Sequence, residues 1–255
     1  HFAMSYPLPP LYLAGQTGSG KTAIALELAR QLAPVEIINA DAFQIYRGLE
    51  ILSAAPPPED RALIPHHLFG ELPVTDECDA AGFARLARAK IAEVALRAIP
   101  LVVGGSGLYL KAITHGLAPT PKGDPNLREE LAALSLDALV GRYRTLDPEG
   151  AARTNLLNRR YVTRNLEICL LSGTPASQLK DGWIENAPAI CAAYLHRDRE
   201  DIYDRINQRT RTMIENGVLA EVAALGKLSD TAEKAIGLGE IRRHLAGETD
   251  LDTCI

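Results

Sequence analysis

Gly15-Gln16-Thr17-Gly18-Ser19-Gly20-Lys21-Thr22 is the stretch that decides the fold of this 255-residue chain. It follows the pattern G-x-x-x-x-G-K-T, which is typical of a phosphate-binding loop (P-loop) between a strand and a helix. The apolar run at 11–14 predicts a buried strand, and the apolar residues at 25, 28, 29 and 32 have the spacing of one helix face. The motif therefore has the context that it needs, and we predict a phosphorylated ligand.

The backbone N–H groups of this loop would surround a di- or triphosphate, and the helix that follows would add partial positive charge. Lys21 would place a full charge beside the phosphate oxygens, and the hydroxyl of Thr22 is suited to Mg²⁺. We therefore predict Mg²⁺ as the cofactor, with Thr22 as its protein ligand. The loop residues predicted to bind diphosphate are Gly15, Gln16, Thr17, Gly18, Ser19, Gly20, Lys21 and Thr22.

The composition, with 47% hydrophobic and 23% charged residues, is that of an ordinary soluble globular protein. No run approaches the ~18 apolar residues that a membrane helix needs, so we expect no membrane segment. The net charge of −5 argues against nucleic-acid binding over the whole surface. It leaves room for a local basic patch, because charges are screened beyond about 8–10 Å at physiological salt.

The cysteines have neither a C-x-x-C pair nor the spacing of a zinc site. Unpaired thiols in a chain of this length fit a reduced, cytoplasmic protein, and each is expected to be a small buried residue. They are Cys78, Cys169, Cys191 and Cys254.

Strand patterns at 35–40 and 100–105 alternate with helical patterns at 80–97 and from 106 onward. Strands and helices that alternate around a phosphate-binding loop predict an α/β fold with a parallel sheet flanked by helices. The pattern changes after 119–123, and from about 125 to about 179 it is wholly helical. The sheet is predicted to resume at 189–195, and a long helix at about 200–225. We therefore predict a P-loop core at 4–120 and 186–255, with an all-helical insertion domain at 121–185.

Asp41 follows the second predicted strand, at the edge of an α/β sheet where ligands collect. It could be a turn carboxylate, or else a general base or water-mediated metal ligand, and its position alone does not separate these roles. The second glycine loop, Gly104-Gly105-Ser106-Gly107, should border the same cleft. Arg205 and Arg209 lie on one helix face and could bind diphosphate, although solvated surface arginines are commoner.

Within the insertion, Arg153, Arg159, Arg160 and Arg164 concentrate positive charge around Tyr161. A basic segment with an aromatic residue is a plausible RNA contact. A solvated helix face explains the same pattern equally well. His66-His67 lacks partners at metal-ligand spacing, and we favour a structural role for this pair.

Together these segments resemble the tRNA dimethylallyltransferases (tRNA isopentenyltransferases, the IPP transferase family) over almost all of 11–247. The phosphate-binding loop stands in the family's place, and the other motifs follow in the family's order. These are Asp41-Ala42-Phe43-Gln44-Ile45-Tyr46, Pro65-His66-His67-Leu68, Gly104-Gly105-Ser106-Gly107-Leu108-Tyr109, Arg164-Asn165-Leu166-Glu167 with Ser172-Gly173, and Arg205-Ile206-x-x-Arg209 with Met213, Gly217 and Glu221-Val222.

Some positions depart from the family's pattern. They are Ala42 for a usual serine, Ser106 for a threonine, Ala55 for a lysine, Tyr161 for an arginine, and Gly237-Leu238-Gly239-Glu240 for Gly-Tyr-Lys-Glu. The sequence also ends at Ile255, before the basic, aromatic C-terminal segment typical of the family.

The resemblance implies transfer of a dimethylallyl group from dimethylallyl diphosphate to the exocyclic amine of the adenine 3′-adjacent to the anticodon in tRNA. Asp41 would take the proton, Thr17 would bond the bridging oxygen, and Arg209 would neutralise the leaving group. The residues that would bind diphosphate outside the loop are Arg205 and Arg209. Those that would contact the tRNA anticodon stem-loop are Asp41, Ala42, Phe43, Gln44, Ser106, Arg159, Arg160 and Arg164, with Gln44 reading the adenine edge. We expect a cytoplasmic monomer.

Other functions remain open at this stage. An adenylate isopentenyltransferase of the cytokinin type would act on AMP, ADP or ATP, but a mononucleotide gives the helical insertion nothing to hold. A P-loop small-molecule kinase would consume ATP instead of a prenyl diphosphate. A non-catalytic RNA-binding protein with this fold would bind RNA whether or not Asp41 and Thr17 were present.

Overall fold

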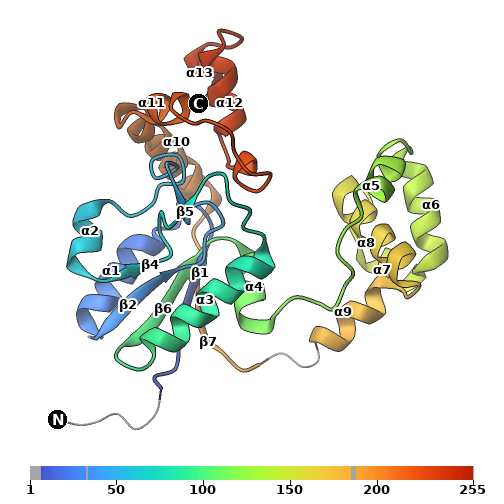
Figure 1. The fold of residues 1–255 in the computed structure, drawn as a ribbon, viewed down its shortest axis with the longest axis horizontal. Coiled ribbons are helices and arrows are strands. Elements are labelled where there is room, and N and C mark those ends of the chain that lie inside the picture. The colour runs from blue at the N-terminus through green and yellow to red at the C-terminus, as the bar shows by residue number, and fades with distance from the viewer. Residues whose placement is uncertain (1–6, 33, 185–187, 255) are drawn as a thin grey trace. The chain divides into compact units, whose positions relative to one another are not determined.

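The computed structural model describes residues 7–32, 34–184 and 188–254 (Figure 1). The chain divides into two compact units, a core of 1–116 with 189–255 and a helical unit of 117–188. The sequence predicts the insertion at 121–185, so the helical unit begins four residues before the predicted start. The predicted boundary between 185 and 186 lies outside the described residues, as do positions 4–6 of the predicted core.

The described part of the core contains a five-stranded sheet in the order β4-β2-β6-β1-β7, and every pairing in it is parallel. The prediction of an α/β fold with a parallel sheet is confirmed. The strands are β1 (Leu11–Gly15), β2 (Val35–Asn39), β4 (His66–His67), β6 (Ile99–Gly104) and β7 (Cys191–Leu195). A separate pair, β3 (Tyr46–Arg47) and β5 (Leu72–Pro73), follows β2.

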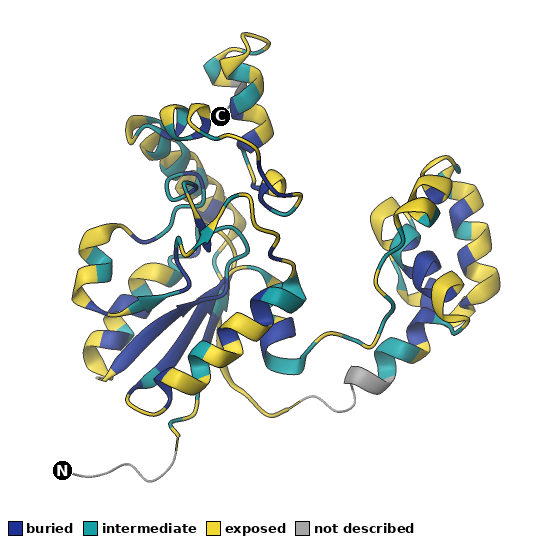
Figure 2. Cartoon of the chain, viewed as in Figure 1, coloured by how far each residue is buried: buried dark blue, intermediate teal, exposed yellow. Residues whose placement is uncertain are grey.

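Both faces of the sheet are covered by helices, and this explains why its central strands are apolar without alternation. Tyr12 and Ile38 pack on the side of α3 and α4, whereas their neighbours Leu13 and Ile37 pack on the side of α1. Figure 2 shows the central strands as dark blue between helices with exposed outer faces. These helices are α1 (Lys21–Gln31), α3 (Ala80–Val94) and α4 (Gly107–His115), with α2 (Pro58–Leu63) after β3.

The prediction of one long helix at about 200–225 is wrong in one respect, because the structure has two helices there. Gly217 has a φ of 91°, a left-handed conformation that ends α10 and starts α11. The sequence pattern did not reveal this break, since apolar spacing continues on both sides of it. The C-terminal elements are α10 (Arg199–Glu215), α11 (Val218–Ala223), the 3₁₀ turn η1 (Ala232–Lys234), α12 (Leu238–Leu245) and α13 (Leu251–Cys254).

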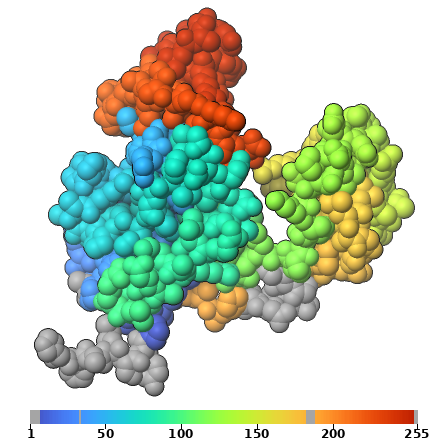
Figure 3. Space-filling view, viewed as in Figure 1, coloured from blue at the N-terminus to red at the C-terminus, as the bar shows by residue number. Residues whose placement is uncertain are grey.

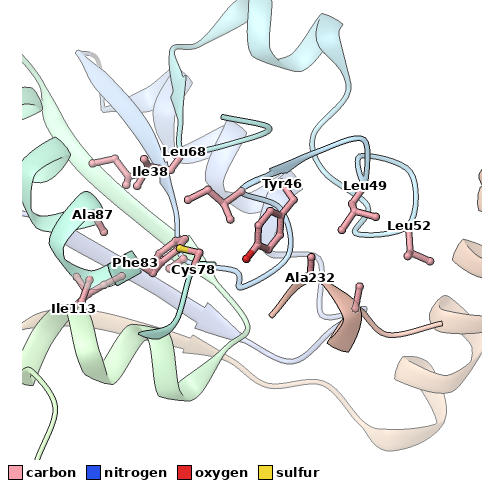
Figure 4. Close-up of a cluster of buried hydrophobic side chains, with 14 of the residues drawn as sticks. Ile38, Tyr46, Leu49, Leu52, Leu68, Cys78, Phe83, Ala87, Ile113 and Ala232 are labelled. Carbon is pink, nitrogen blue, oxygen red and sulfur yellow. The ribbon is translucent and has the colours of Figure 1, made fainter. Parts of the chain in front are cut away.

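A buried tyrosine joins the C-terminal elements to the N-terminal part of the core. The Tyr46 hydroxyl lies 2.6 Å from Thr231 Oγ1, which also accepts the backbone N–H of Cys78 at 3.1 Å. Figure 4 shows the Tyr46 ring among Leu49, Cys78 and Ala232. In Figure 3 the orange and red surface of this C-terminal region adjoins the blue and cyan surface of the N-terminal part of the core. Residues distant in sequence therefore share one hydrophobic cluster.

The helical unit contains no strand among its described residues, as the pattern predicts. Buried Leu139, Tyr143 and Leu166 form its centre. Side-chain oxygens of Asp124, Ser135, Asp147 and Asn158 accept backbone N–H groups at the first turns of α5, α6, α7 and α8. The helices are α5 (Pro125–Ala132), α6 (Leu136–Leu146), α7 (Pro148–Arg153), α8 (Arg159–Ser172) and α9 (Ala176–Ile184).

The cysteines do not all follow the prediction that each is buried. Cys78 and Cys169 are buried, but Cys191 is exposed because it lies on β7, the edge strand of the sheet. The side chain of Cys254 lies outside the described residues. Burial raises the pKa of the Cys78 thiol to about 11.

Gly104 allows β6 to approach β2 closely. A Cβ added there would overlap the carbonyl group of Ala40, and neither backbone can move without disturbing the sheet. We predict that Gly104→Ala lowers the free energy of unfolding by about 2 kcal/mol, as overpacking typically does. Denaturant unfolding measures this change.

Gly107→Ala is the matched control, because an added Cβ there has nothing within 4 Å among the described residues and Gly107 starts a helix. Its stability should be unchanged or slightly higher. Equal stability of the two variants would contradict the close approach.

Candidate functional site

The phosphate-binding loop takes the conformation that its glycines permit. Gly18 and Gly20 have φ values of 79° and 91°, which other residues adopt only with strain. Gly20 leads directly into α1, so the N–H groups of the first helical turn point toward the loop. The Lys21 ammonium donates to the Gln16 carbonyl at 2.8 Å, which folds the lysine back over the loop.

A cavity of about 370 Å³ lies over the loop, and we call it the phosphate cavity. The predicted diphosphate-binding residues that line it are Thr17, Gly18, Gly20, Lys21, Thr22, Arg205 and Arg209. Gly15, Gln16 and Ser19 are not part of the lining that the described residues form, and Ser19 is buried beneath the loop. Gly104 and Gly105 of the second glycine loop line the same cavity, as expected. The loop therefore presents both backbone and cationic groups to one cavity.

The cations around this cavity are partly desolvated. Burial lowers the pKa of Lys21, and the Arg209 charge adds to that effect while the Asp41 carboxylate opposes it. Burial likewise lowers the pKa of Arg209, again opposed by Asp41. Positive charges held away from water gain most when an anion arrives. The cavity is therefore suited to a di- or triphosphate.

Two arginines hold the loop itself. Arg205 Nε donates to the Gly18 carbonyl at 2.6 Å, and Arg197 Nε donates to the Ser19 carbonyl at 2.7 Å. Arg205 was predicted as a diphosphate ligand, whereas sequence reasoning missed Arg197. The signal that could have found Arg197 is its place just after the strand now seen as β7, at the ligand-binding edge of the sheet.

Asp41 occupies the turn after β2. Its Oδ1 accepts the Phe43 N–H at 3.1 Å, and its own N–H donates to Asn39 Oδ1 at 2.7 Å. One carboxylate oxygen thus accepts the hydrogen bond that forms the turn. A turn carboxylate is one of the roles that the sequence leaves open for Asp41. Asp41 also lines the phosphate cavity, so its carboxyl group is within reach of a ligand that enters there.

A second cavity of about 630 Å³, which we call the apolar cavity, adjoins the first. Thr17, Asp41, Ser53 and Arg209 line both cavities. The rest of its lining includes the apolar side chains of Phe43, Leu52, Ile206, Met213, Ile214, Val218 and Ile236. A phosphate group and an apolar or aromatic group can therefore meet beside one carboxylate and one guanidinium.

The other predicted RNA-contact residues of the core lie in different places, and Gln44 lines the phosphate cavity. Gln44 Nε2 donates to the carbonyls of Ser53 and Ala54 at 3.0 and 3.1 Å, so its amide donors hold the backbone. Among the described residues, Ala42 and Ser106 line neither cavity. Phe43 lines the apolar cavity.

The arginines of the helical unit are mostly engaged inside it. Arg159 Nη2 donates to the carbonyls of residues 131, 132 and 134, at 3.2, 2.9 and 2.6 Å. Arg164 pairs with buried Glu167 at 2.5 Å, and Arg153 pairs with Asp181 at 2.9 Å. Within the described part of the chain, exposed Arg160 has no such partner. Arg153, Arg159 and Arg164 therefore have partners inside the helical unit, and their predicted contact with RNA stays a prediction.

The histidine pair also has structural partners. His66 Nδ1 lies 2.7 Å from the Ile64 carbonyl, and His67 Nε2 lies 2.6 Å from Glu36. Among the described residues, no group of three or more His, Cys, Asp or Glu side chains could hold a metal. In the same part of the chain, no helix is long and apolar enough to cross a membrane.

Comparison with known proteins decides the family. The family model described as IPP transferase matches residues 44–255. The chain belongs to the IPP transferase family. A tRNA dimethylallyltransferase of Akkermansia muciniphila is 45% identical, over 96% of this chain and 83% of the relative. One of Syntrophobacter fumaroxidans is 40% identical, over 97% of this chain and 75% of the relative.

Solved structures of the IPP transferase family have the same fold. The full-length tRNA isopentenylpyrophosphate transferase of Bacillus halodurans matches with a TM-score of 0.65 and 31% identity, over 96% of this chain and 80% of that one. A eukaryotic dimethylallyltransferase acting on tRNA matches with a TM-score of 0.75 over 97% of this chain and 65% of that one. Because the two sequences are 24% identical, this match supports a shared fold and nothing further.

The lining of the phosphate cavity predicts which arginine binds diphosphate. Arg209→Ala should weaken the binding of inorganic diphosphate about 10-fold or more, because a partly buried cation that faces the anion is lost. Arg211→Ala is the control, since Arg211 lies on the same helix but is exposed. Titration calorimetry measures both, and equal affinities would place Arg209 outside the anion site.

Proposed function

We propose that this chain transfers the dimethylallyl group of dimethylallyl diphosphate to the exocyclic amine of the adenine directly 3′ of the anticodon in tRNA. Its relatives carry the name tRNA dimethylallyltransferase. The observation that carries the proposal is the lining shared by the phosphate and apolar cavities. Thr17, Asp41 and Arg209 stand where a prenyl diphosphate and an adenine would meet.

The reaction breaks the bond between the first prenyl carbon and the bridging oxygen and forms a carbon–nitrogen bond. The diphosphate leaves with the electron pair of the broken bond, so negative charge develops over the phosphate-binding loop. Lys21 and Arg209 would neutralise that charge, and the Thr17 hydroxyl would donate to the bridging oxygen. In this mechanism the phosphate-binding loop therefore binds the diphosphate, which is the leaving group.

Asp41 would accept the proton that the amine loses on attack. Its Oδ1 is held by the Phe43 N–H, so the carboxyl group is oriented before the substrate arrives. An amine conjugated to a purine is a weak nucleophile, and correct placement should supply much of the rate. The adenine must leave the stack of the anticodon loop to reach this carboxylate, at a cost of a few kcal/mol.

Mg²⁺ fits the residues at the loop, because Thr22, which carries a hydroxyl, lines the phosphate cavity and this ion is commonly held by one or two protein oxygens together with substrate phosphates. When bound, it would supply further positive charge to the leaving diphosphate. Thr22 is the residue that we propose holds it.

We propose the helical unit as a further contact for the tRNA. Arg160 and Tyr161 are exposed at the start of α8, whereas Arg159 and Arg164 are engaged within the unit. An exposed cation can meet a phosphate, and an exposed ring can stack on an unpaired base. We also propose that the protein is a monomer in the cytoplasm, where unmodified tRNA and reduced cysteines occur together.

Mass spectrometry tests the reaction directly. We predict that an unmodified anticodon stem-loop, incubated with the protein, Mg²⁺ and dimethylallyl diphosphate, gains one five-carbon unit on the adenine beside the anticodon. AMP, ADP and ATP in a parallel tube should stay unmodified. Transfer to the mononucleotides alone would make the chain an adenylate isopentenyltransferase, and ATP consumption with phosphate transfer would make it a kinase.

Asp41→Asn tests the base. Asparagine keeps a side-chain oxygen for the Phe43 N–H but cannot take a proton, so we predict turnover lower by ~10²-fold or more. Stem-loop affinity should change by no more than about twofold. Asp79→Asn is the matched control, because the Asp79 carboxylate also accepts a backbone N–H, that of Gly82 at 2.7 Å, away from both cavities. Near-normal turnover of Asp41→Asn would remove Asp41 as the base.

A further inference from the structure

A short loop separates the spaces around Arg209. A side cavity of about 830 Å³ adjoins the phosphate cavity, and residues 54–57 line both. We call residues 51–55 the partition loop, because Ile51 lines the side cavity, Leu52 the apolar cavity, and Ser53 both the apolar and phosphate cavities. The position of this loop therefore sets the shape of each cavity.

Arg209 stands at the same junction. It lines the phosphate, apolar and side cavities, and its Nη2 donates to the Ser53 carbonyl at 3.4 Å. This hydrogen bond links the guanidinium directly to the partition loop. The partition loop thus contacts Arg209, the residue that would neutralise the leaving diphosphate.

Side chains from outside the partition loop hold it in addition to its own backbone hydrogen bonds, such as that from the Ala54 N–H to the Ile51 carbonyl at 3.0 Å. Ala54 has a φ of 48°, a left-handed conformation that is unfavourable for a residue other than glycine. Gln44 holds one side of the loop through the carbonyls of Ser53 and Ala54. The other side is held from α11.

Glu221 on α11 is that second anchor. Its two carboxylate oxygens accept the backbone N–H groups of Ile51 and Leu52, each at 2.8 Å. Burial raises the pKa of Glu221, and the two N–H groups oppose this rise, as expected where they favour the ionised form. Within the described part of the chain, Glu221 lines none of the cavities around Arg209. It touches the loop, and not the ligands.

We propose that Glu221 is a positioning residue for the transfer reaction: it fixes the partition loop, and through Ser53 the Arg209 guanidinium, between donor and acceptor. The inference rests on the proposed function. A displacement of about 1 Å at reacting groups can reduce turnover by about 10²-fold, so an anchor this close to the junction should affect rate more than binding.

Glu221→Gln tests the anchor. Glutamine offers one carbonyl oxygen to the two N–H groups, and its own NH₂ faces the second of them. We expect kcat for transfer to the stem-loop to fall about 10-fold or more, with stem-loop affinity within about twofold of the parent. Glu215→Gln is the matched control, because Glu215 is exposed on α10 and outside the described cavity linings. It should leave kcat unchanged.

Hydrogen exchange provides a readout independent of turnover. The Ile51 and Leu52 amides should exchange at least about 10-fold faster in Glu221→Gln than in the parent or in Glu215→Gln. If the parent transfers no dimethylallyl group, the proposed function fails, and this exchange still reports whether Glu221 holds the loop. Unchanged exchange would overturn the anchor.

A double-mutant cycle with Gln44→Leu separates positioning from general destabilisation. Both residues would act on the same loop, so the double variant should lose less kcat than the product of the two single losses. If Glu221→Gln does not fold, Gln44→Leu alone should lower kcat more than stem-loop affinity. A multiplicative loss, or unchanged kcat in folded Glu221→Gln, would overturn the proposal.

Discussion

The parallel register of β1, β2 and β6 is the constraint on which the site depends. Ala14 pairs with Gly104, and Asn39 with Val103, so the chain leaves each strand at the same edge of the sheet. That edge receives the phosphate-binding loop, Asp41 and the second glycine loop. The close approach of Gly104 to the Ala40 carbonyl fixes the spacing. A side chain at position 104 would separate the strands that bring the site together.

The charged side chains at this edge of the sheet suit it to bind an anion. Lys21 and Arg209 are partly removed from water, and the carboxylate that offsets them is Asp41. An arriving diphosphate can replace lost hydration with direct contacts. Lys21, Arg205 and Arg209 each donate to a backbone carbonyl and also line the phosphate cavity, so the same cations shape the site and face the ligand.

The helical unit shows how a charge pattern can serve the fold. Glu167 is buried and accepts hydrogen bonds from Arg164, three residues before it, and Arg128, thirty-nine residues before it. Burial alone would raise the pKa of Glu167, but these two arginines hold it below its usual value. Removing either partner would leave a buried carboxylate poorly compensated. The run of arginines in the sequence does not disclose these partners, because one of them lies in another helix.

The sequence by itself determined the α/β fold, the phosphate-binding loop and the family's ordered motifs, because these depend on local spacing and residue type. It also placed Asp41 at the ligand-binding edge, since that follows from where a parallel strand ends. Only the tertiary structure decided that Gly217 breaks the long helix, that Gln44 holds a loop, and that Glu221 anchors it. The carbonyls that Gln44 reaches and the N–H groups that Glu221 accepts depend on how the chain packs in three dimensions, whereas the break at Gly217 is a local left-handed conformation that the apolar spacing does not reveal.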